Sequence, residues 1–519
     1  MPVSANALFS LLAVALPFLF PWSAPPLPEL WALLFSWACI ALLAALAWCQ
    51  PESLDGWARR LAWGLLLAAL CSAVIGLLQY FGYGAHLSLW AHAAEAGQAQ
   101  GNLRQRNHLA SLLNLGSWAA LWLLAQRPAG EVMTLRVRAG VCLALGLLAA
   151  GCAATASRTG GLQWLLMGGL LVWWWRASGR AVLRWGLLAG LVYGLSAGVL
   201  PLLLQWGSGV STQGVFERVA LESASCESRS VLWANVLTLI AQRPWTGWGW
   251  GELDYAHYMT LFPGLRFCVL LDNAHNLPLQ LAVELGLPLA LLACGGILVL
   301  LWSARPWREA VPARQLAWGV LALIGLHSLL EYPLWYGPFQ LTVLYALALL
   351  RPASLGRWHG PAWAPAFVLG FFLALGSYLL WDYHRVRQLY LTTYQRDPAY
   401  REQTLDKVGG SWVYANEVNF AIVTTTPLTP QHADRIHALS LSLLHYSPEP
   451  AVIEALIGSA CLLGRNDEAA FHYIRYRAAY PQDHARWQGT QTYCPRFSPE
   501  LSGPVAESPV PHRGNPKTP

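Results

Sequence analysis

Long apolar runs alternate with short polar segments through most of the chain before residue 382. A helix needs about 20 consecutive, mostly apolar residues to cross a bilayer, and runs near this length recur along the region. Eleven of them are candidate transmembrane helices, at residues 6–22, 29–49, 60–82, 108–126, 138–155, 160–175, 185–205, 277–301, 315–331, 338–351 and 363–381. The pattern therefore predicts an all-α polytopic membrane protein with about 11 transmembrane helices.

The chain after residue 381 has a different pattern, since it is polar and rich in Tyr and Arg. Helical periodicity returns there in three short stretches, which resemble a tetratricopeptide (TPR)-type helical hairpin. These stretches are 433–444, 451–463 and 467–480. Residues 498–519 are Pro-rich and have no apolar periodicity, which is typical of disordered segments.

Composition narrows the class of protein further. The 519 residues are 55% apolar and only 12% charged, whereas soluble domains carry about 25% charged residues. The net charge of +6 comes from basic residues in short segments between apolar runs, so we expect no nucleic-acid partner. The first apolar run lacks a basic stretch before it and a small-residue cleavage site, so we expect it to be retained as a span.

The distribution of arginine in the short loops predicts the orientation in the membrane. With the N-terminus inside, most loop arginines lie inside, and the short outer loops hold only Arg104, Arg106 and Arg158. This orientation places 83–107, 206–276 and everything after about 382 outside. The expected domains are therefore a transmembrane domain at 1–381 with its outer loop at 206–276, an α-helical TPR-like domain at 382–497 on the outer side, and a tail at 498–519.

Four of the ten cysteines fall in the expected outer segments. Cys226 and Cys268 share the long outer loop, and Cys461 and Cys494 share the polar C-terminal region. Two pairs in outer segments suggest disulfides formed in an oxidising compartment, with free thiols as the alternative. Neither the Cys and His spacing nor the carboxylates have the pattern of a metal site, so no metal is expected.

Residues 101–108 concentrate polar side chains directly before an apolar helix. Arg104, Gln105, Arg106, Asn107 and His108 follow one another there. Donors at a helix start form an anion site, and the guanidinium fork suits phosphate oxygens. The alternative is a solvated anchor whose arginines touch lipid headgroups.

Two further arginines stand out by their position along the chain. Arg158 lies between two apolar runs with almost no loop, where a charge usually faces a cavity and has a partner, although a snorkelling Arg is the alternative. Arg229 begins an amphipathic stretch of the long outer loop. Tryptophan and glycine then alternate over 244–251, a surface suited either to stacking on sugar rings or to anchoring at the membrane interface.

His275 is the sharpest candidate for catalysis. It lies in the sequence Asp272-Asn273-Ala274-His275-Asn276, where a polar loop runs into an apolar helix that begins near Leu277. A histidine titrates near neutral pH and is suited to general-base chemistry, and Asn276 lies next to it to orient it. A structural histidine is the alternative.

Several of these segments together resemble a known family. The chain resembles the bacterial O-antigen ligase and polymerase superfamily of membrane glycosyltransferases, and within it the PglL-type O-linked oligosaccharyltransferases. The resemblance spans most of residues 80–350 and is carried by Gly101–Ala110, Ser157–Gly160, Ser228–Trp233 with the following Pro244–Gly249, Asp272–Asn276 and His327–Tyr336.

One spacing separates the branches of this superfamily. Its ligases carry His, then Asn, Ser or Gln, then nine residues, then Gly, with a small residue or Tyr three positions further. His275, Asn276 and Gly286 fit this pattern, but Leu289 does not. The departure weakens the lipopolysaccharide-ligase assignment, whereas the segment from Asn102 to His108 favours the protein-glycosylating branch.

The resemblance implies a metal-independent enzyme without a cofactor, located in the bacterial inner membrane with its active site and C-terminus in the periplasm. It implies transfer of a preassembled glycan from a polyprenyl (undecaprenyl) diphosphate carrier to Ser or Thr of exported proteins such as pilin, with membrane lipid around it. His275 is the expected catalytic base. Arg158 and Arg229, with Arg104 or Arg106, are expected to hold the diphosphate. The expected positioning residues are Gln105, Asn107, His108, Asn276 and Tyr332.

Two other functions stay open at this point. An O-antigen ligase or polymerase would use the same site with a lipid A-core or glycan acceptor. A transporter of lipid-linked glycans would show Gly- or Pro-broken spans in matching halves, and the sequence has no such symmetry.

Overall fold

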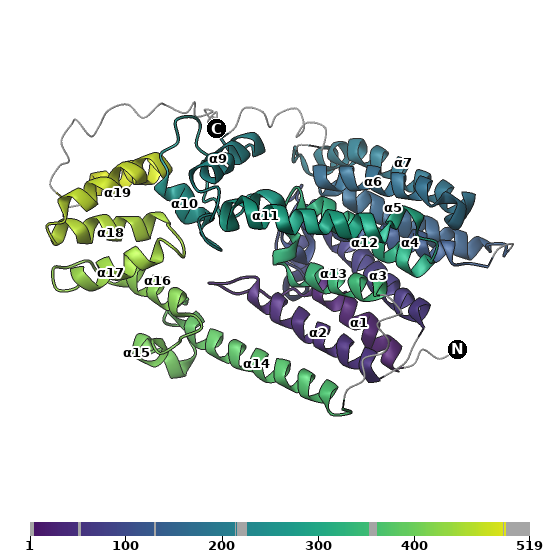
Figure 1. Ribbon diagram of the computed structural model, residues 1–519, viewed down its shortest axis with the longest axis horizontal. Helices are drawn as coiled ribbons and strands as arrows, with labels where there is room; N and C mark the ends of the chain where they lie inside the picture. Colours follow the sequence, from purple (N-terminus) through teal and green to yellow (C-terminus); the bar gives the residue numbers. More distant parts are fainter. Residues whose placement is uncertain are drawn as a thin grey trace. The chain divides into compact units, whose positions relative to one another are not determined.

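The computed structural model describes residues 5–49, 53–128, 131–212, 214, 226–351, 361–490 and 493–494. Every regular element among them is a helix, which confirms the all-α class (Figure 1). The longer helices before residue 382 are α1 (Ala5–Leu19), α2 (Leu30–Cys49), α3 (Leu54–Tyr80), α4 (Arg106–Ala125), α5 (Leu135–Ala154), α6 (Arg158–Trp173), α7 (Trp175–Ser208), α9 (Arg229–Gln242), α10 (Leu253–Met259), α11 (Leu277–Ala304), α12 (Pro312–Ser328), α13 (Gly337–Leu350) and α14 (Ala364–Arg387).

The C-terminal region continues with shorter helices. They are α15 (Thr404–Val408), α16 (Ala415–Thr425), α17 (Ala433–Leu443), α18 (Pro450–Leu462), α19 (Asn466–Ala479) and α20 (Pro481–Thr490). Short 3-10 helices also occur along the chain, at Gly84–Trp90, Gly101–Leu103, Pro306–Arg308, Pro333–Trp335, Gln388–Tyr390 and Pro398–Tyr400. The three predicted helical stretches correspond to α17, α18 and α19, and the tail 498–519 lies outside the described residues.

Helices occupy all eleven predicted span positions, but seven described helices are long and apolar enough to cross a bilayer. These seven are Leu30–Cys49, Leu54–Tyr80, Arg106–Ala125, Leu135–Ala154, Arg180–Ser208, Leu277–Arg308 and Ala364–Tyr390. The helices at the other four positions, α1, α6, α12 and α13, have 15, 16, 17 and 14 residues. Two of these short helices begin directly after a turn: Ala156 has a positive φ just before α6, and a 3-10 turn precedes α13. The chain is a multi-pass membrane protein.

The chain divides into two compact units, which are described separately below. Unit 1 comprises Met1–Leu221, His275–Leu277 and Gly295–Trp381. Unit 2 comprises Glu222–Ala274, Pro278–Cys294 and Asp382–Pro519.

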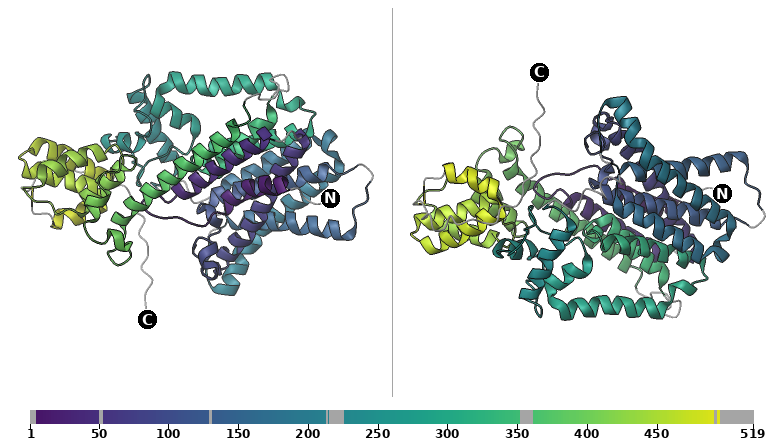
Figure 2. Two further views of the ribbon diagram at one scale, coloured as in Figure 1. Left: turned by 90° about the horizontal axis from the view of Figure 1, so that it is seen from below. Right: turned by 90° about the horizontal axis from the view of Figure 1, so that it is seen from above.

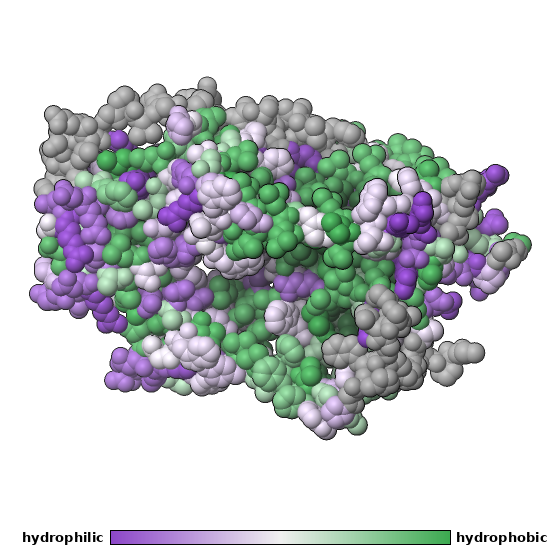
Figure 3. Space-filling model, viewed as in Figure 1, coloured by the Kyte–Doolittle hydropathy of each residue, from purple (hydrophilic) through white to green (hydrophobic). Residues whose placement is uncertain are grey.

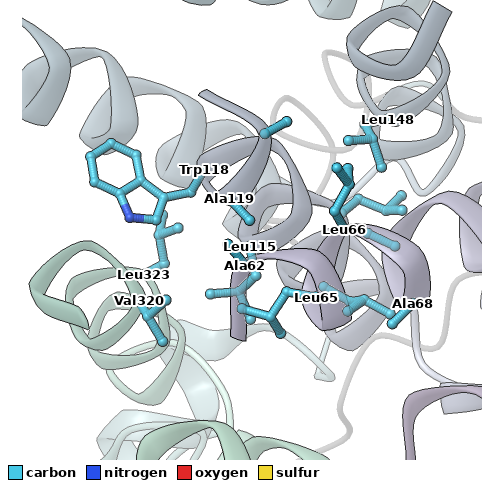
Figure 4. Close-up of a cluster of buried hydrophobic side chains, with 14 of the residues drawn as sticks. Ala62, Leu65, Leu66, Ala68, Leu115, Trp118, Ala119, Leu148, Val320 and Leu323 are labelled. Carbon is cyan, nitrogen blue, oxygen red and sulfur yellow. The ribbon is translucent and has the colours of Figure 1, made fainter. Parts of the chain in front are cut away.

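Unit 1 is a helical bundle with α4 at its centre, where every residue from His108 to Trp122 is buried (Figures 1 and 2). Small residues let the helices approach closely, as is usual in membrane bundles. A Cβ at Gly116 would lie 2.2 Å from the Cβ of Ala69 on α3. Likewise, Gly319 on α12 leaves room for the indole of Trp118, whose Nε1 donates to the carbonyl of Leu316. Trp118, Val320 and Leu323 belong to the cluster of buried apolar side chains in this bundle (Figure 4).

Unit 2 joins the loop region around α9 and α10 to the C-terminal helices. The Tyr258 hydroxyl lies 3.0 Å from Nδ1 of His472, and Nε of Arg475 donates to the carbonyl of Met259. The structure contains both predicted disulfides, Cys226–Cys268 and Cys461–Cys494, with Cα–Cα distances of 5.5 and 5.2 Å. Hydrophilic residues colour the surface over α17–α19, whereas apolar residues dominate that of the long helices (Figure 3).

Candidate active site

His275 lies at the first turn before α11, and its backbone is held in an uncommon conformation. Its φ of +48° is in the left-handed region, which residues other than glycine rarely adopt and which is often found at functional sites. Next to it, Nδ2 of Asn276 donates to the carbonyl of Leu329. The start of α11 is thereby tied to the segment that follows α12.

That segment supplies a carboxylate to the histidine. Oε2 of Glu331 lies 2.6 Å from Nδ1 of His275. The Glu331 side chain is 5% exposed and that of His275 is 27% exposed, so the pair is sheltered on the glutamate side and accessible on the histidine side. Glu331 follows directly on the last turn of α12, where its N–H donates to the carbonyl of His327.

The polar segment before α4 also contacts this carboxylate. Nδ2 of Asn107 donates to Oε1 of Glu331 at 2.7 Å, while Nε2 of Gln105 lies at the long distance of 3.5 Å from Oε2. On its other side, Oδ1 of Asn107 accepts from the hydroxyl of Ser157 at 2.6 Å. Ser157 is the N-cap of α6, because its Oγ accepts from the N–H of Gly160.

Aromatic rings complete the surroundings of the pair. The ring of Tyr332 meets that of His275 edge-on, with a centroid distance of 5.1 Å. His108, by contrast, is fully buried in the core of unit 1, with its ring centroid 4.0 Å from that of Tyr336 and 5.1 Å from that of His327. Of the expected positioning residues, Gln105, Asn107, Asn276 and Tyr332 therefore gather around Glu331 and His275, while His108 packs beneath them.

The arginines expected to hold a diphosphate have different settings. Arg158 is the first residue of α6, directly after Ser157, and Arg106 is the first residue of α4; both are half-buried. Arg104 is bound at 2.9 Å to Oε1 of Glu29, a carboxylate between α1 and α2, and to the carbonyl of Pro28. Its guanidinium is thus already paired with an acid within unit 1.

Arg229 belongs to unit 2 and begins α9 after the N-cap Ser228. Its side chain is half-buried. Its expected contribution to the same anion site as Arg158 stays a prediction.

Gly286, which fits the family spacing, has a structural role inside unit 2. It has a φ of +81° at a kink of α11, where a Cβ would lie 2.5 Å from the carbonyl oxygen of Trp245. The tryptophan–glycine loop packs against this kink, and the N–H of Trp248 donates to the carbonyl of Val283. Trp245 and Trp250 are left largely exposed at the surface of the loop. Glycine is therefore required at position 286 because the backbones of Gly286 and Trp245 approach each other closely.

Two side chains of the candidate site were not singled out from the sequence, Glu331 and Ser157. Glu331 is a lone acid at the end of an apolar helix, and such a charge near a membrane needs a partner, which was the available signal. In the part of the chain that the structure describes, no three His, Cys, Asp or Glu side chains form a metal-binding group. The expectation of a metal-independent reaction stays a prediction.

The fold and site define a multi-pass helical membrane protein with a histidine–carboxylate pair where membrane helices begin and end. Three family models match the chain: O-antigen ligase at residues 143–294, protein glycosylation ligase at 99–124, and the C-terminal part of the virulence factor membrane-bound polymerase at 315–493. These matches confirm the resemblance inferred from the sequence: residues 143–294 are similar to O-antigen ligases, and residues 99–124 are similar to protein glycosylation ligases.

A characterised relative points the same way. The chain is similar to a general O-oligosaccharyltransferase of Acinetobacter baylyi (strain ATCC 33305 / BD413 / ADP1), with 26% identity over 306 residues. The match covers 55% of this chain and 49% of the relative, so the chain spans about half the length of that protein.

Proposed function

We propose that this protein transfers a preassembled glycan from a polyprenyl diphosphate carrier to a Ser or Thr hydroxyl of an exported protein such as pilin. The observation that carries the proposal is the contact between His275 and Glu331, beside a segment matched by the protein glycosylation ligase model. The name of the Acinetobacter relative supports the reaction class. The reaction takes place at the periplasmic face of the inner membrane.

His275 is the general base of the proposed reaction. Its ring is partly exposed at a helix start, where a lipid-borne donor and a soluble acceptor can meet. Nε2 takes the proton of the acceptor hydroxyl while the oxygen forms a bond to the anomeric carbon. The bond from that carbon to the diphosphate oxygen breaks, and its electron pair leaves with the polyprenyl diphosphate. His275 then releases the proton to the departing diphosphate or to water, which restores the base.

Arginine side chains stabilise the leaving diphosphate in this proposal. Arg158 is placed at the N-terminus of α6, where backbone N–H groups and the helix dipole also favour an anion. Arg106 stands at the corresponding position of α4. Arg229, the first residue of α9, is the further arginine that the resemblance implies. Their guanidinium groups supply the electrostatic stabilisation of developing charge that a metal supplies elsewhere. Arg104 is paired with Glu29 within unit 1.

A second candidate function is an O-antigen ligase or polymerase, which the matches to the O-antigen ligase and membrane-bound polymerase models favour. The donor chemistry is shared, so the acceptor decides between them. The test uses the purified full chain with a polyprenyl-diphosphate-linked oligosaccharide and, in parallel, pilin, lipid A-core and a free glycan as acceptors. Mass spectrometry that finds the glycan on a Ser or Thr of pilin supports the proposal. Transfer to lipid A-core or glycan alone would replace it by the second function.

A further inference from the structure

We propose that Glu331 is the positioning carboxylate of this site, and that it couples the base His275 to the start of α6 through Asn107 and Ser157. The inference rests on the proposed function and adds to it a residue that acts through His275 instead of touching the substrate. It is argued from four side chains, all within unit 1.

The first step concerns which nitrogen of His275 carries the hydrogen. An ionised carboxylate only accepts hydrogen bonds, so the contact of 2.6 Å requires Nδ1 of His275 to donate its N–H to Glu331. Nε2 is then left with its lone pair, as a general base requires. Hydrogen bonds to a charged partner are also the strong ones, which fixes the plane of the ring.

The second step concerns charge. When Nε2 takes a proton, the imidazole becomes a cation that faces the carboxylate of Glu331. Because Glu331 is 5% exposed, little water screens this attraction. The carboxylate therefore favours the charged imidazole that forms during transfer, which a neutral amide in its place does not.

The third step follows the hydrogen bonds away from the histidine. Since Oε1 of Glu331 can only accept, it orients the amide of Asn107 so that Nδ2 faces it. The amide oxygen of Asn107 then points to Ser157, which donates its hydroxyl hydrogen to it. Oγ of Ser157 in turn accepts from the N–H of Gly160. Each group in this series of hydrogen bonds therefore acts consistently as either a donor or an acceptor toward each neighbour.

This series of hydrogen bonds ends where α6 begins, and Arg158 is the first residue of that helix. A change in the position of the α6 start therefore reaches the ring of His275 through Ser157, Asn107 and Glu331. The arrangement aligns the base with the arginine proposed to hold the donor. Effective catalysis depends on such alignment, since small displacements of reacting groups are costly.

A purely structural role for Glu331, holding the start of α11 against the end of α12, makes different predictions. A structural role lowers the yield of folded protein and leaves the pH dependence of the folded fraction unchanged. A positioning role lowers kcat and changes its pH profile, because the negative charge beside the imidazole is lost.

The test compares Glu331→Gln and Glu331→Asp with the wild-type full chain in the in vitro transfer reaction. We expect Glu331→Gln to lower kcat by about 10²- to 10⁴-fold, the range found when general-base catalysis or its orienting carboxylate is lost, with little change in KM for the donor. The acidic limb of its kcat profile should move to lower pH. Glu331→Asp keeps the charge and should recover part of kcat and the wild-type profile. Asn107→Ala should lower kcat less.

The matched control is Asp382→Asn, which removes another buried carboxylate that accepts from Arg385 and Ser411 in unit 2. It should leave the pH profile unchanged. Wild-type kcat and pH profile in Glu331→Gln, together with an inactive His275→Ala, would overturn this inference and leave the proposed function standing. Full activity in both variants would overturn the proposed base as well. If Glu331→Gln does not insert, Glu331→Asp and Asn107→Ala decide: wild-type kcat in both overturns the inference.

Discussion

His275 and Glu331 are 56 residues apart in the sequence, and their side chains meet at 2.6 Å. His275 lies in the region matched by the O-antigen ligase model, while Glu331 lies in the region matched by the membrane-bound polymerase model. The candidate site is thus assembled from two matched regions, with Asn107 supplied by the protein glycosylation ligase segment. Each region alone contains an incomplete set of these side chains.

Replacing Arg158 by lysine tests the proposed donor site. Arg158→Lys should weaken binding of the lipid-linked donor by about tenfold or more, because a point charge cannot reproduce two parallel bonds from a planar fork. The measurement is the Kd of the donor, with Arg127→Lys as the control, since Arg127 pairs with Glu131 just beyond the opposite end of α4 from Arg106. Equal donor affinity in the two variants would remove Arg158 from the donor site.

The disulfide Cys226–Cys268 should be detectable in the native membrane. Mass mapping without reduction should find one linked peptide that joins the two cysteines, whereas the exposed Cys49, the last residue of α2, should react with a membrane-permeant thiol reagent. On the chain-entropy model a bridge that closes a loop of 42 residues stabilises by about 4 kcal/mol. Cys226→Ser should therefore lower the resistance of unit 2 to proteolysis. Rapid labelling of both cysteines in the wild type contradicts the bridge.

The C-terminal helices should lose stability as the pH falls. Burial lowers the pKa of His472 and of His484 from 6.5 to about 4, so both are neutral in the folded chain. The unfolded chain takes up protons first, so the stability is fully present above pH 6.5 and is lost as the pH falls toward 4. At pH 5.5 each histidine should cost about 1.4 kcal/mol relative to neutral pH.

Hydrogen-exchange mass spectrometry of the full chain measures this effect in α18–α20. Protection there should fall between pH 7 and 5.5 after correction for the intrinsic exchange rate. The double variant His472→Gln with His484→Gln should show a flatter dependence. Protection that is independent of pH in the wild type would show that these histidines do not control stability.

The orientation proposed from the loop arginines has a direct test. Reporter fusions at residues 210, 310 and 400 should read outside, inside and outside, because Arg305, Arg308 and Arg314 mark the segment around 310 as cytoplasmic. An inside reading at both 210 and 400 would place His275 on the wrong side of the membrane for an exported acceptor.

The helices could be predicted from the sequence because a membrane helix requires a long run of apolar residues. Each of the eleven runs contains a helix. Their number as full spans was harder to predict, because turns shorten the helices locally. Ala156 has a left-handed backbone two residues before the 16-residue α6, and Pro338 stands at the start of the 14-residue α13. The hydrophobicity of the sequence alone does not predict where these turns lie.

The site could be predicted only in part. Some of its residues lie in polar or aromatic motifs that can be recognised in the sequence alone, namely His275, Asn107 and Tyr332. The roles of Glu331 and Glu29 depend on contacts between segments far apart in the chain, with His275 and Arg104 respectively. Such pairings exist only after the helices have packed, so a single sequence does not reveal them.

The most direct test of the account measures donor binding and glycan transfer in parallel for the wild type and His275→Ala. The residue lies at a helix start, so the variant should insert normally and bind the lipid-linked donor with wild-type affinity. Its transfer to the protein acceptor should fall by about 10²- to 10⁴-fold, the usual cost of removing a general base. Wild-type transfer by correctly inserted His275→Ala would contradict the account at its centre.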